Sequence, residues 1–303
     1  MFDTVNIFQP AERVKSIDLL VETPCYLERV FSNLQGNVFT GHLGNYRVSI
    51  SERGVYLKGS ISAFANGSNL NILPRKMIKE SIEQLSDRMH IQLMDAKVNR
   101  LDIASNLTME HKPEAYFPHL GKKRYYEREV FPHTIYYHGQ LITIAFYNKG
   151  IESKKYLPIE SWNDNILRCE LRLKKRPHKY LNLPEVTPAL LCDESFNRRL
   201  IGEFKREYGS IPKLKNIHSF PSNILGPGEI TPFFATQYIN SIGGVNNALD
   251  YIDTLKFQLK EHKSRAKKYI KELCTNDRFT LEEPLIMELN KKMETMFQEL
   301  LAA

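Results

Sequence analysis

Short apolar runs that alternate with polar residues fill the first 70 residues and return between about residues 97 and 175, which is the pattern of β-strands. The stretch 47–64 alternates on both sides of Glu52–Gly54 and predicts a hairpin or two strands. Three later stretches predict further strands: KVNRLDIASNL at 97–107, HTIYYHGQLITIAFYNKG at 133–150 and NILRCELRLKK at 165–175. In the second, His138–Gly139 lies between two apolar runs, which is a short hairpin signal.

Helical periodicity interrupts the strands once and dominates after about residue 187. Apolar residues spaced by four, three and four positions predict a helix after Pro74, which fits a first turn: Ile78, Ile82, Leu85 and Met89. A second helix leads to Gly209 as a C-cap. Residues 209–235 carry four prolines and read as a linker or extended loop. Two long helices follow, over about 246–274 and 281–300, the latter with a capping box at Thr280 and Glu283.

These elements predict an α+β domain followed by a helical C-terminal part. The last two helices each have an apolar stripe, so we expect them to pack against each other as a helical hairpin. Docking of the first of them on duplex DNA and a role in dimerisation stay open. The chain has no internal repeat and no low-complexity segment.

Composition places the chain among ordinary globular proteins, with 42% apolar and 25% charged residues. There is no run of about 18 apolar residues, so we expect no membrane span. The start, MFDTVNIFQPAERVK, lacks the order of a secretory signal. Four scattered cysteines form no CxxC pair and predict reduced thiols in a cytoplasmic protein: Cys25, Cys169, Cys192 and Cys274.

The charge is uneven along the chain. The net charge is +7, and the stretch 97–179 alone holds 16 Lys or Arg against 9 Asp or Glu, which is the whole excess. A concentrated excess of cations favours a polyanionic partner, most simply nucleic acid.

Polar residues share one face of each later strand, because residues i and i+2 of a strand point the same way. Arg100 and Asp102 lie opposite Leu101 and Ile103. Thr143 and Tyr147 lie opposite the apolar residues of their strand. The last strand has four charged residues on one face: Arg168, Glu170, Arg172 and Lys174. If these strands belong to one sheet, the apolar face packs on helices and the polar face gathers acids, cations and a tyrosine.

This set of side chains is suited to phosphoryl chemistry. Two carboxylates, Asp102 and Glu170, are hard oxygen ligands of the kind that Mg²⁺ or Mn²⁺ prefers. A neutral phenol is a weak nucleophile, and a cation near Tyr147, either Lys149 or a metal, would favour its phenolate. The competing interpretation is structural: Asp102 in an ion pair with Arg100, and Glu170 in a charge ladder with Arg168 and Arg172.

The order of four sequence blocks resembles the replication initiators of the filamentous-phage gene II/X type and related phage and plasmid rolling-circle initiators. The blocks are GSISAFANGSNL, NRLDIASN, TIAFYNKGIE and LRCELRLKK followed by YL. They span roughly residues 50 to 185. The resemblance implies a catalytic domain over residues 1–186, with an antiparallel sheet and helices on one face, of the HUH-endonuclease kind. It fades beyond about residue 187, where the pattern itself predicts a helical region over 187–303. The His-x-His motif is absent, as it is in those initiators.

The resemblance also implies a function. Such initiators are site-specific endonucleases and strand transferases that nick one strand at an origin, stay attached through a 5′-phosphotyrosine and later rejoin the strand. Tyr147 would be the nucleophile, and Asp102 and Glu170 would hold Mg²⁺ or Mn²⁺. Lys149 and Arg168 would hold or polarise phosphate, and Arg100, Arg168, Arg172 and Lys174 would contact DNA. Implied partners are double- and single-stranded origin DNA, a host helicase, a DNA polymerase and a second copy of the chain in the cytoplasm of a bacterial host.

Several alternatives stay open. His138 is a candidate third metal ligand, and Tyr136 and Tyr137 are rival nucleophiles. The segment GKKRYYER, with Tyr125 and Tyr126, reads either as a solvated loop or as a basic loop whose aromatic rings stack on bases. A non-catalytic origin-binding protein is the main alternative function, and an RNA-binding or RNA-processing protein is a third. No Arg…His-x-x-Arg…Tyr order appears late in the chain, which argues against a tyrosine recombinase.

Overall fold

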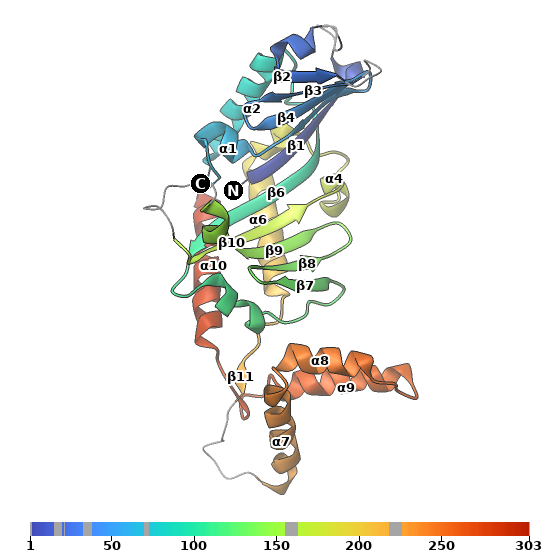
Figure 1. The fold of residues 1–303 in the computed structure, drawn as a ribbon, viewed down its shortest axis with the longest axis vertical. Coiled ribbons are helices and arrows are strands. Elements are labelled where there is room, and N and C mark those ends of the chain that lie inside the picture. The colour runs from blue at the N-terminus through green and yellow to red at the C-terminus, as the bar shows by residue number, and fades with distance from the viewer. Residues whose placement is uncertain are drawn as a thin grey trace.

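The computed structural model describes residues 2–14, 20, 22–32, 38–69, 73–154, 163–217 and 226–302. Within them, ten strands form one antiparallel sheet in the order β2-β3-β4-β5-β1-β6-β10-β9-β8-β7 (Figure 1). The strands are β1 Phe2–Pro10, β2 Glu28–Ser32, β3 Val38–Leu43, β4 Tyr46–Ser51, β5 Gly54–Lys58, β6 Lys97–Thr108, β7 Glu127–Phe131, β8 Thr134–His138, β9 Thr143–Asn148 and β10 Ile166–Leu173. A separate pair joins β11 Asn216–Ile217 to β12 Thr280–Leu281.

The helices occur in three parts of the chain. They are α1 Ile61–Asn66, α2 Arg75–Met89, α3 Lys149–Ser153, α4 Pro177–Tyr180, α5 Pro188–Leu191, α6 Glu194–Gly209, α7 Pro227–Ser241, α8 Val245–Thr254, α9 Lys260–Leu273 and α10 Pro284–Ala302. Short 3₁₀ turns lie at Ala11–Arg13, Thr23–Tyr26, Pro113–Ala115 and Phe117–His119. No helix among the described residues is long and apolar enough to cross a membrane.

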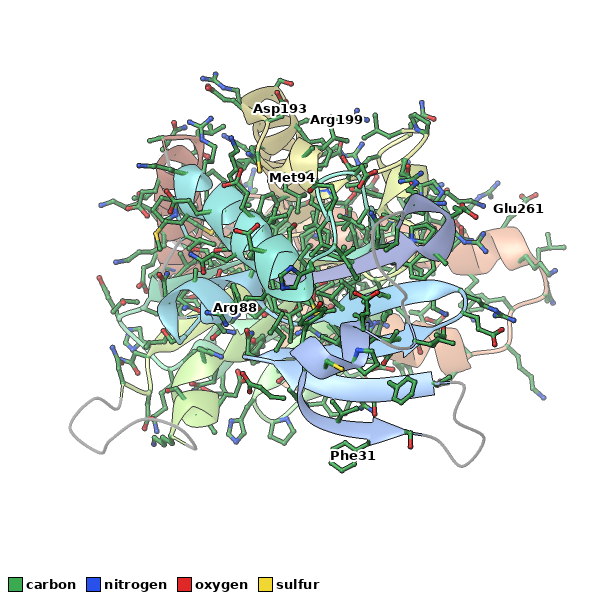
Figure 2. The ribbon with its side chains drawn as sticks, turned by 90° about the horizontal axis from the view of Figure 1, so that it is seen from above. Phe31, Arg88, Met94, Asp193, Arg199 and Glu261 are labelled. Carbon is green, nitrogen blue, oxygen red and sulfur yellow. The ribbon has the colours of Figure 1, made fainter. Side chains whose placement is uncertain are left out.

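The apolar face of the sheet is covered by α2, α6 and α10. Side chains such as Leu101, Ile144 and Leu171 are fully buried there. The three helices meet one another, because Ile78, Ile201 and Leu300 line a single apolar crevice. In Figure 1, α6 and α10 lie behind the strands. Figure 2 shows Arg199 of α6 near one margin, Phe31 of β2 at the opposite margin and Arg88 of α2 between them. The expected architecture, an antiparallel sheet with helices on one face, is confirmed.

Most local predictions are confirmed as well. The hairpin around Glu52–Gly54 joins β4 to β5, and His138 begins the turn that joins β8 to β9. Helix α2 follows Pro74 and buries the four apolar residues that predicted it. Helix α6 has Asp193 as its N-cap, which accepts a hydrogen bond from the backbone N–H of Phe196 at 2.7 Å. The predicted C-cap is wrong by one residue, because Gly209 is the last residue of the helix and Ser210 is the C-cap.

The C-terminal part differs from the prediction in three ways. The expected helix over 246–274 is two helices, α8 and α9, that pack on each other, with Lys263 and Lys267 of α9 paired to Asp253 of α8. Helix α10 packs on α6 and β6 instead of pairing with α9, so the expected hairpin with the last helix is wrong. Helix α7 begins within the expected linker of residues 209–235. One of the four prolines that predicted the linker, Pro221, lies outside the described residues.

The prolines and the predicted capping box of this region explain part of the difference. Pro227 is compatible with α7 because it is the first helical residue, whose N–H needs no partner within the helix. Thr280 does not cap α10: its hydroxyl donates to the carbonyl oxygen of Asn276, and Glu283 accepts the N–H of Leu285 instead.

Two hydrophobic clusters organise the described residues. The larger one joins the sheet to α2, α6 and α10, so it contains side chains from both sides of residue 186, such as Leu171, Leu200 and Phe297. The smaller one lies among α7, α8 and α9 and includes Ile239, Leu249 and Leu273. The division into two domains at residue 186 stays a prediction. The packing of α6 and α10 against the sheet bears on it, because these helices lie after residue 186 and share a core with the strands before it.

Candidate active site

The polar face of the sheet brings together residues of β9, β10 and β6 in three transverse rows. The register pairs Tyr147 with Arg168 and Arg168 with Asn106; Ala145 with Glu170 and Glu170 with Ala104; and Thr143 with Arg172 and Arg172 with Asp102. Because paired residues on one face lie side by side, Glu170 is surrounded by polar groups from the rows above and below. The assumption that the three strands are neighbours is therefore confirmed.

Glu170 is the centre of this face. Its Oε1 accepts a hydrogen bond from the hydroxyl of Tyr147 at 2.8 Å and one from Nε of Arg168 at 2.6 Å. Its Oε2 accepts from Nε of Arg172 at 2.5 Å. The carboxylate is 3% exposed as a residue, so these three partners replace its water. Two of the predicted site residues, Tyr147 and Glu170, are thus in direct contact.

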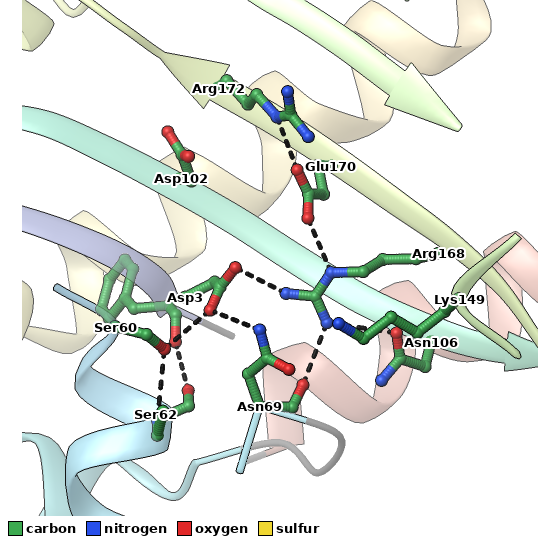
Figure 3. Close-up of polar contacts among 12 residues, drawn as sticks. Asp3, Ser60, Ser62, Asn69, Asp102, Asn106, Lys149, Arg168, Glu170 and Arg172 are labelled. Atoms are coloured by element: carbon green, nitrogen blue, oxygen red, sulfur yellow. Dashed lines mark hydrogen bonds and ion pairs between the residues drawn. The ribbon is translucent and has the colours of Figure 1, made fainter. Parts of the chain in front are cut away.

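Arg168 is held on every side by protein (Figure 3). Besides Glu170, it binds Oδ2 of Asp3 at 2.7 Å, the backbone oxygen of Asn69 at 3.0 Å and Oδ1 of Asn106 at 3.1 Å. Asp3 is itself fixed by Ser60, which donates a hydrogen bond at 2.7 Å. With 2% of its surface exposed, Arg168 positions Glu170 in this arrangement and does not reach solvent.

Sequence reasoning missed Asp3, Asn69 and Asn106. Asn106 had a signal, because it lies four residues after Asp102 and therefore on the same face of β6. Asp3 had none: a register irregularity between Phe2 and Val5 disturbs the alternation of β1.

The protonation states follow from this environment. Burial, and then the charge of Glu170, raises the pKa of the Tyr147 phenol. Burial also works to raise the pKa of Glu170, but Arg172 and Arg168 outweigh it and lower that pKa to about 2. At neutral pH the phenol is therefore protonated and the carboxylate ionised, as the 2.8 Å hydrogen bond requires.

Asp102 and Lys149 lie at the two ends of this region. Both carboxylate oxygens of Asp102 accept from Nε of Arg100, at 3.0 and 3.1 Å. Burial raises the pKa of Asp102, and the bond from Arg100 opposes that shift. Lys149 follows Tyr147 by two residues, is 6% exposed and pairs with Glu152 at 3.0 Å. Asn148, between Tyr147 and Lys149, is the N-cap of α3, and its side chain accepts a hydrogen bond from the backbone N–H of Ile151.

The expected metal ligands are not gathered into one group. The part of the chain that the structure describes contains no cluster of three or more His, Cys, Asp or Glu suited to a metal ion. His138 contacts Thr143 and Glu129, at 3.2 and 3.1 Å, and Arg172 stands between His138 and Asp102 in the register. With the oxygens of both acids bound by arginines, the residues as arranged do not fit Mg²⁺ or Mn²⁺.

A hollow of about 340 Å³ opens beside Tyr147. Its other walls include Tyr136, Asn148 and Arg172, whose guanidinium lies 5.5 Å from the centre of the Tyr136 ring. Tyr136 thus shares the hollow with Tyr147. Tyr137 points to the opposite face, is fully buried and donates to the carbonyl oxygen of Gly121 at 3.0 Å, which removes it as a rival nucleophile.

The comparison with known proteins agrees with the resemblance seen in the sequence. No curated protein matches the chain. Residues 32–195, just over half of the chain, match the family model for the N-terminal region of the phage replication-associated gene II protein. The match includes Asp102, Tyr147 and Glu170 but not Asp3. The chain therefore belongs to this family of replication-associated proteins and is a replication initiator of the filamentous-phage gene II type.

Proposed function

We propose that this initiator nicks one strand of origin DNA with Tyr147 and later rejoins it, acting as an endonuclease and strand transferase. The observation that carries the proposal is the hydrogen bond of 2.8 Å from Tyr147 to Glu170 beside an open hollow that Arg172 also lines. The hollow offers a phosphodiester a nucleophile, a proton acceptor and a guanidinium at one place.

In the nicking step, the Tyr147 oxygen attacks the phosphorus and its proton passes to Glu170. The bond from phosphorus to the 3′ oxygen breaks, and that oxygen takes a proton from solvent, which leaves a 3′-hydroxyl and a 5′-phosphotyrosine. Rejoining reverses the step: the 3′-hydroxyl attacks the phosphotyrosine and the phenol regains its proton from Glu170. The phosphotyrosine retains the bond that sealing needs, so no nucleotide cofactor is consumed.

The ion pairs of Glu170 with Arg168 and Arg172 make the site unreactive while no DNA is bound. With a pKa of about 2, Glu170 is a poor proton acceptor. A phosphate bound by Arg172 would draw that guanidinium away from Glu170 and raise the pKa of the carboxylate, which would then accept the phenol proton more readily. Substrate binding would in this way switch on the base. Arg100 and Lys174, both at the surface of this face, are proposed further contacts to DNA.

A divalent cation stays part of the proposal only as a prediction from the resemblance. Asp102 and Glu170 would have to release arginines before either could bind Mg²⁺ or Mn²⁺. A host helicase, a DNA polymerase and a second copy of the chain likewise stay proposed partners.

The alternative is an origin-binding initiator without catalysis. The observation that favours it is the complete set of ion pairs around both acids, which also fits a charge ladder that stabilises the sheet.

Nicking is tested by incubating the protein with supercoiled DNA that carries its replication origin, with Mg²⁺ or Mn²⁺, and denaturing the mixture. We expect a covalent protein–DNA adduct that Tyr147→Phe abolishes. Tyr136→Phe is the matched control, because Tyr136 lines the same hollow without contacting Glu170 by any described hydrogen bond. An adduct that survives Tyr147→Phe and is lost in Tyr136→Phe would move the nucleophile to Tyr136. Origin binding without any adduct would favour the alternative.

A further inference from the structure

The loop at residues 121–126 is fixed to α6 by a buried ion pair. Lys123 binds Oε2 of Glu207 at 3.0 Å, and the hydroxyl of Tyr126 donates to the same oxygen at 2.8 Å. Lys123 and Glu207 are 7% exposed each. Two residues of the predicted basic loop are therefore structural and point inward.

Tyr125, between these anchors, points outward. It is 82% exposed, and its φ of 65° places it in the left-handed region, which a bulky side chain rarely adopts. The guanidinium of Arg124 lies 4.5 Å from the centre of its ring. A loop that is rigid on both sides thus holds an exposed aromatic ring in a strained backbone conformation, and such strain is concentrated at functional sites.

Tyr125 forms one wall of a hollow of about 380 Å³. The other walls are aromatic and aliphatic: Tyr126, Tyr180 and the β8–β9 turn from Gly139 to Ile142. Along β9, this turn lies about 16 Å from Tyr147, which separates the hollow from the candidate active site. The hollow is large enough for a flat ring system and offers a ring face to stack on.

A basic turn leads into α4, whose last residue, Tyr180, lines this hollow. The residues before Tyr180 form this basic turn, with exposed side chains at Lys174, Lys175, Arg176 and Lys179. Within the described residues, none of these four has an acidic partner at ion-pair distance, and no Asp or Glu occurs between Leu171 and Pro184. Arg176, like Tyr125, has a left-handed backbone, with φ of 54°.

We infer that this hollow binds an unpaired base of single-stranded DNA, with Tyr125 as the stacking platform. Arg124 and the basic turn at 174–179 hold the neighbouring phosphates. Single-stranded nucleic acid is bound by this combination, because every base has a face that stacks on an aromatic ring while a cationic surface follows the backbone. The inference extends the replication role of the chain and does not require that Tyr147 is the nucleophile.

The test is the affinity for a labelled oligothymidylate of about 20 nucleotides, measured by fluorescence anisotropy at one fixed salt concentration. Tyr125→Gly removes the ring and also relieves the left-handed strain, so folding should be unharmed. We expect the affinity of Tyr125→Gly to fall about fivefold or more while its Tm equals or exceeds that of the wild type. Tyr125→Phe keeps the ring and should bind within about twofold of the wild type.

Two controls make the result specific. Tyr251→Ala removes another exposed tyrosine, on α8, and should leave the affinity unchanged. For a duplex of the same length, Tyr125→Gly should change the affinity by less than about twofold, since paired bases cannot stack on the ring.

Wild-type affinity in Tyr125→Gly would overturn the inference, and so would an equal loss for duplex DNA or a loss in Tyr125→Phe as large as in Tyr125→Gly. The oligothymidylate assay measures affinity and the origin assay measures the covalent adduct, so a failure of either proposal is seen separately.

Discussion

Arg172 of β10 stands directly opposite Asp102 of β6, yet it binds Glu170 on its own strand. Asp102 is instead held by Arg100, two residues before it. Each acid of the site is thus neutralised by an arginine of its own strand. Arg172 also lines the hollow beside Tyr147, and the proposed function requires it to leave Glu170 for a phosphate.

Glu170→Gln should destabilise the protein and abolish the adduct. The change leaves Arg168, which is 2% exposed, with Asp3 as its remaining anion among the described contacts, and breaking a buried pair costs about 3–5 kcal/mol. Urea unfolding gives the free energy change. Glu129→Gln is the control, because the Glu129 side chain is 43% exposed. A stable Glu170→Gln protein that still forms the adduct would contradict both the structural and the chemical role of Glu170.

Acid should remove the stability that Glu170 contributes. Its pKa falls from 4.5 to about 2 in the folded protein, so the contribution is complete above about pH 4.5 and is lost as the pH falls through 2. A shift of this size corresponds to about 3 kcal/mol. The free energy of unfolding of the wild type and of Glu170→Gln should therefore converge between pH 5 and pH 2. A difference that stays constant over this range would show that the carboxylate charge is not the cause.

Asp3→Asn should weaken catalysis by releasing Arg168. Asp3 holds Arg168 at 2.7 Å, and Arg168 positions Glu170. We expect a loss of stability of about 2 kcal/mol or more and slower adduct formation, with origin binding retained. Asp87→Asn, an exposed change on α2, is the control. Adduct formation at the wild-type rate in folded Asp3→Asn would remove Asp3 from the site.

Gly150→Ala should disturb the segment that carries Tyr147, Asn148 and Lys149. A Cβ at this position would lie 1.9 Å from the backbone oxygen of Asn163, so the backbone has to shift. We expect destabilisation of about 2 kcal/mol and loss of the adduct. Gly202→Ala in α6 is a matched control, since a Cβ there meets nothing within 4 Å and should stabilise the helix by about 0.5–1 kcal/mol. Equal Tm values for the two variants would contradict this prediction.

The faces of the strands could be predicted from the sequence because apolar neighbours fix them. Leu101 and Ile103 bury one side of β6, which leaves Asp102 on the other, and the same alternation in β10 places Glu170. The four blocks of sequence then identified the family. The partner of Arg168 could not be predicted, because Asp3 reaches it through the pairing of β1 with β6, far along the chain.

The helix break after Thr254 was hidden for a different reason. Leu249 and Leu273 bury a stripe whether the chain continues straight or folds back, so the periodicity of the apolar residues is the same in both cases. The ion pairs from Asp253 to Lys263 and Lys267 show the fold-back, but charged side chains are mostly exposed whether or not they are paired, so the sequence alone does not reveal these pairs.

The packing of α10 against the sheet has a practical consequence. The family match ends at residue 195, two residues into α6, whereas the apolar face of the sheet is covered by α6 and α10 together. A fragment cut at the end of the match would expose the side chains that Leu200, Leu289 and Phe297 now cover, and a large apolar surface of this kind leads to aggregation. Soluble expression of the half that carries the candidate site therefore calls for a chain that runs to residue 302.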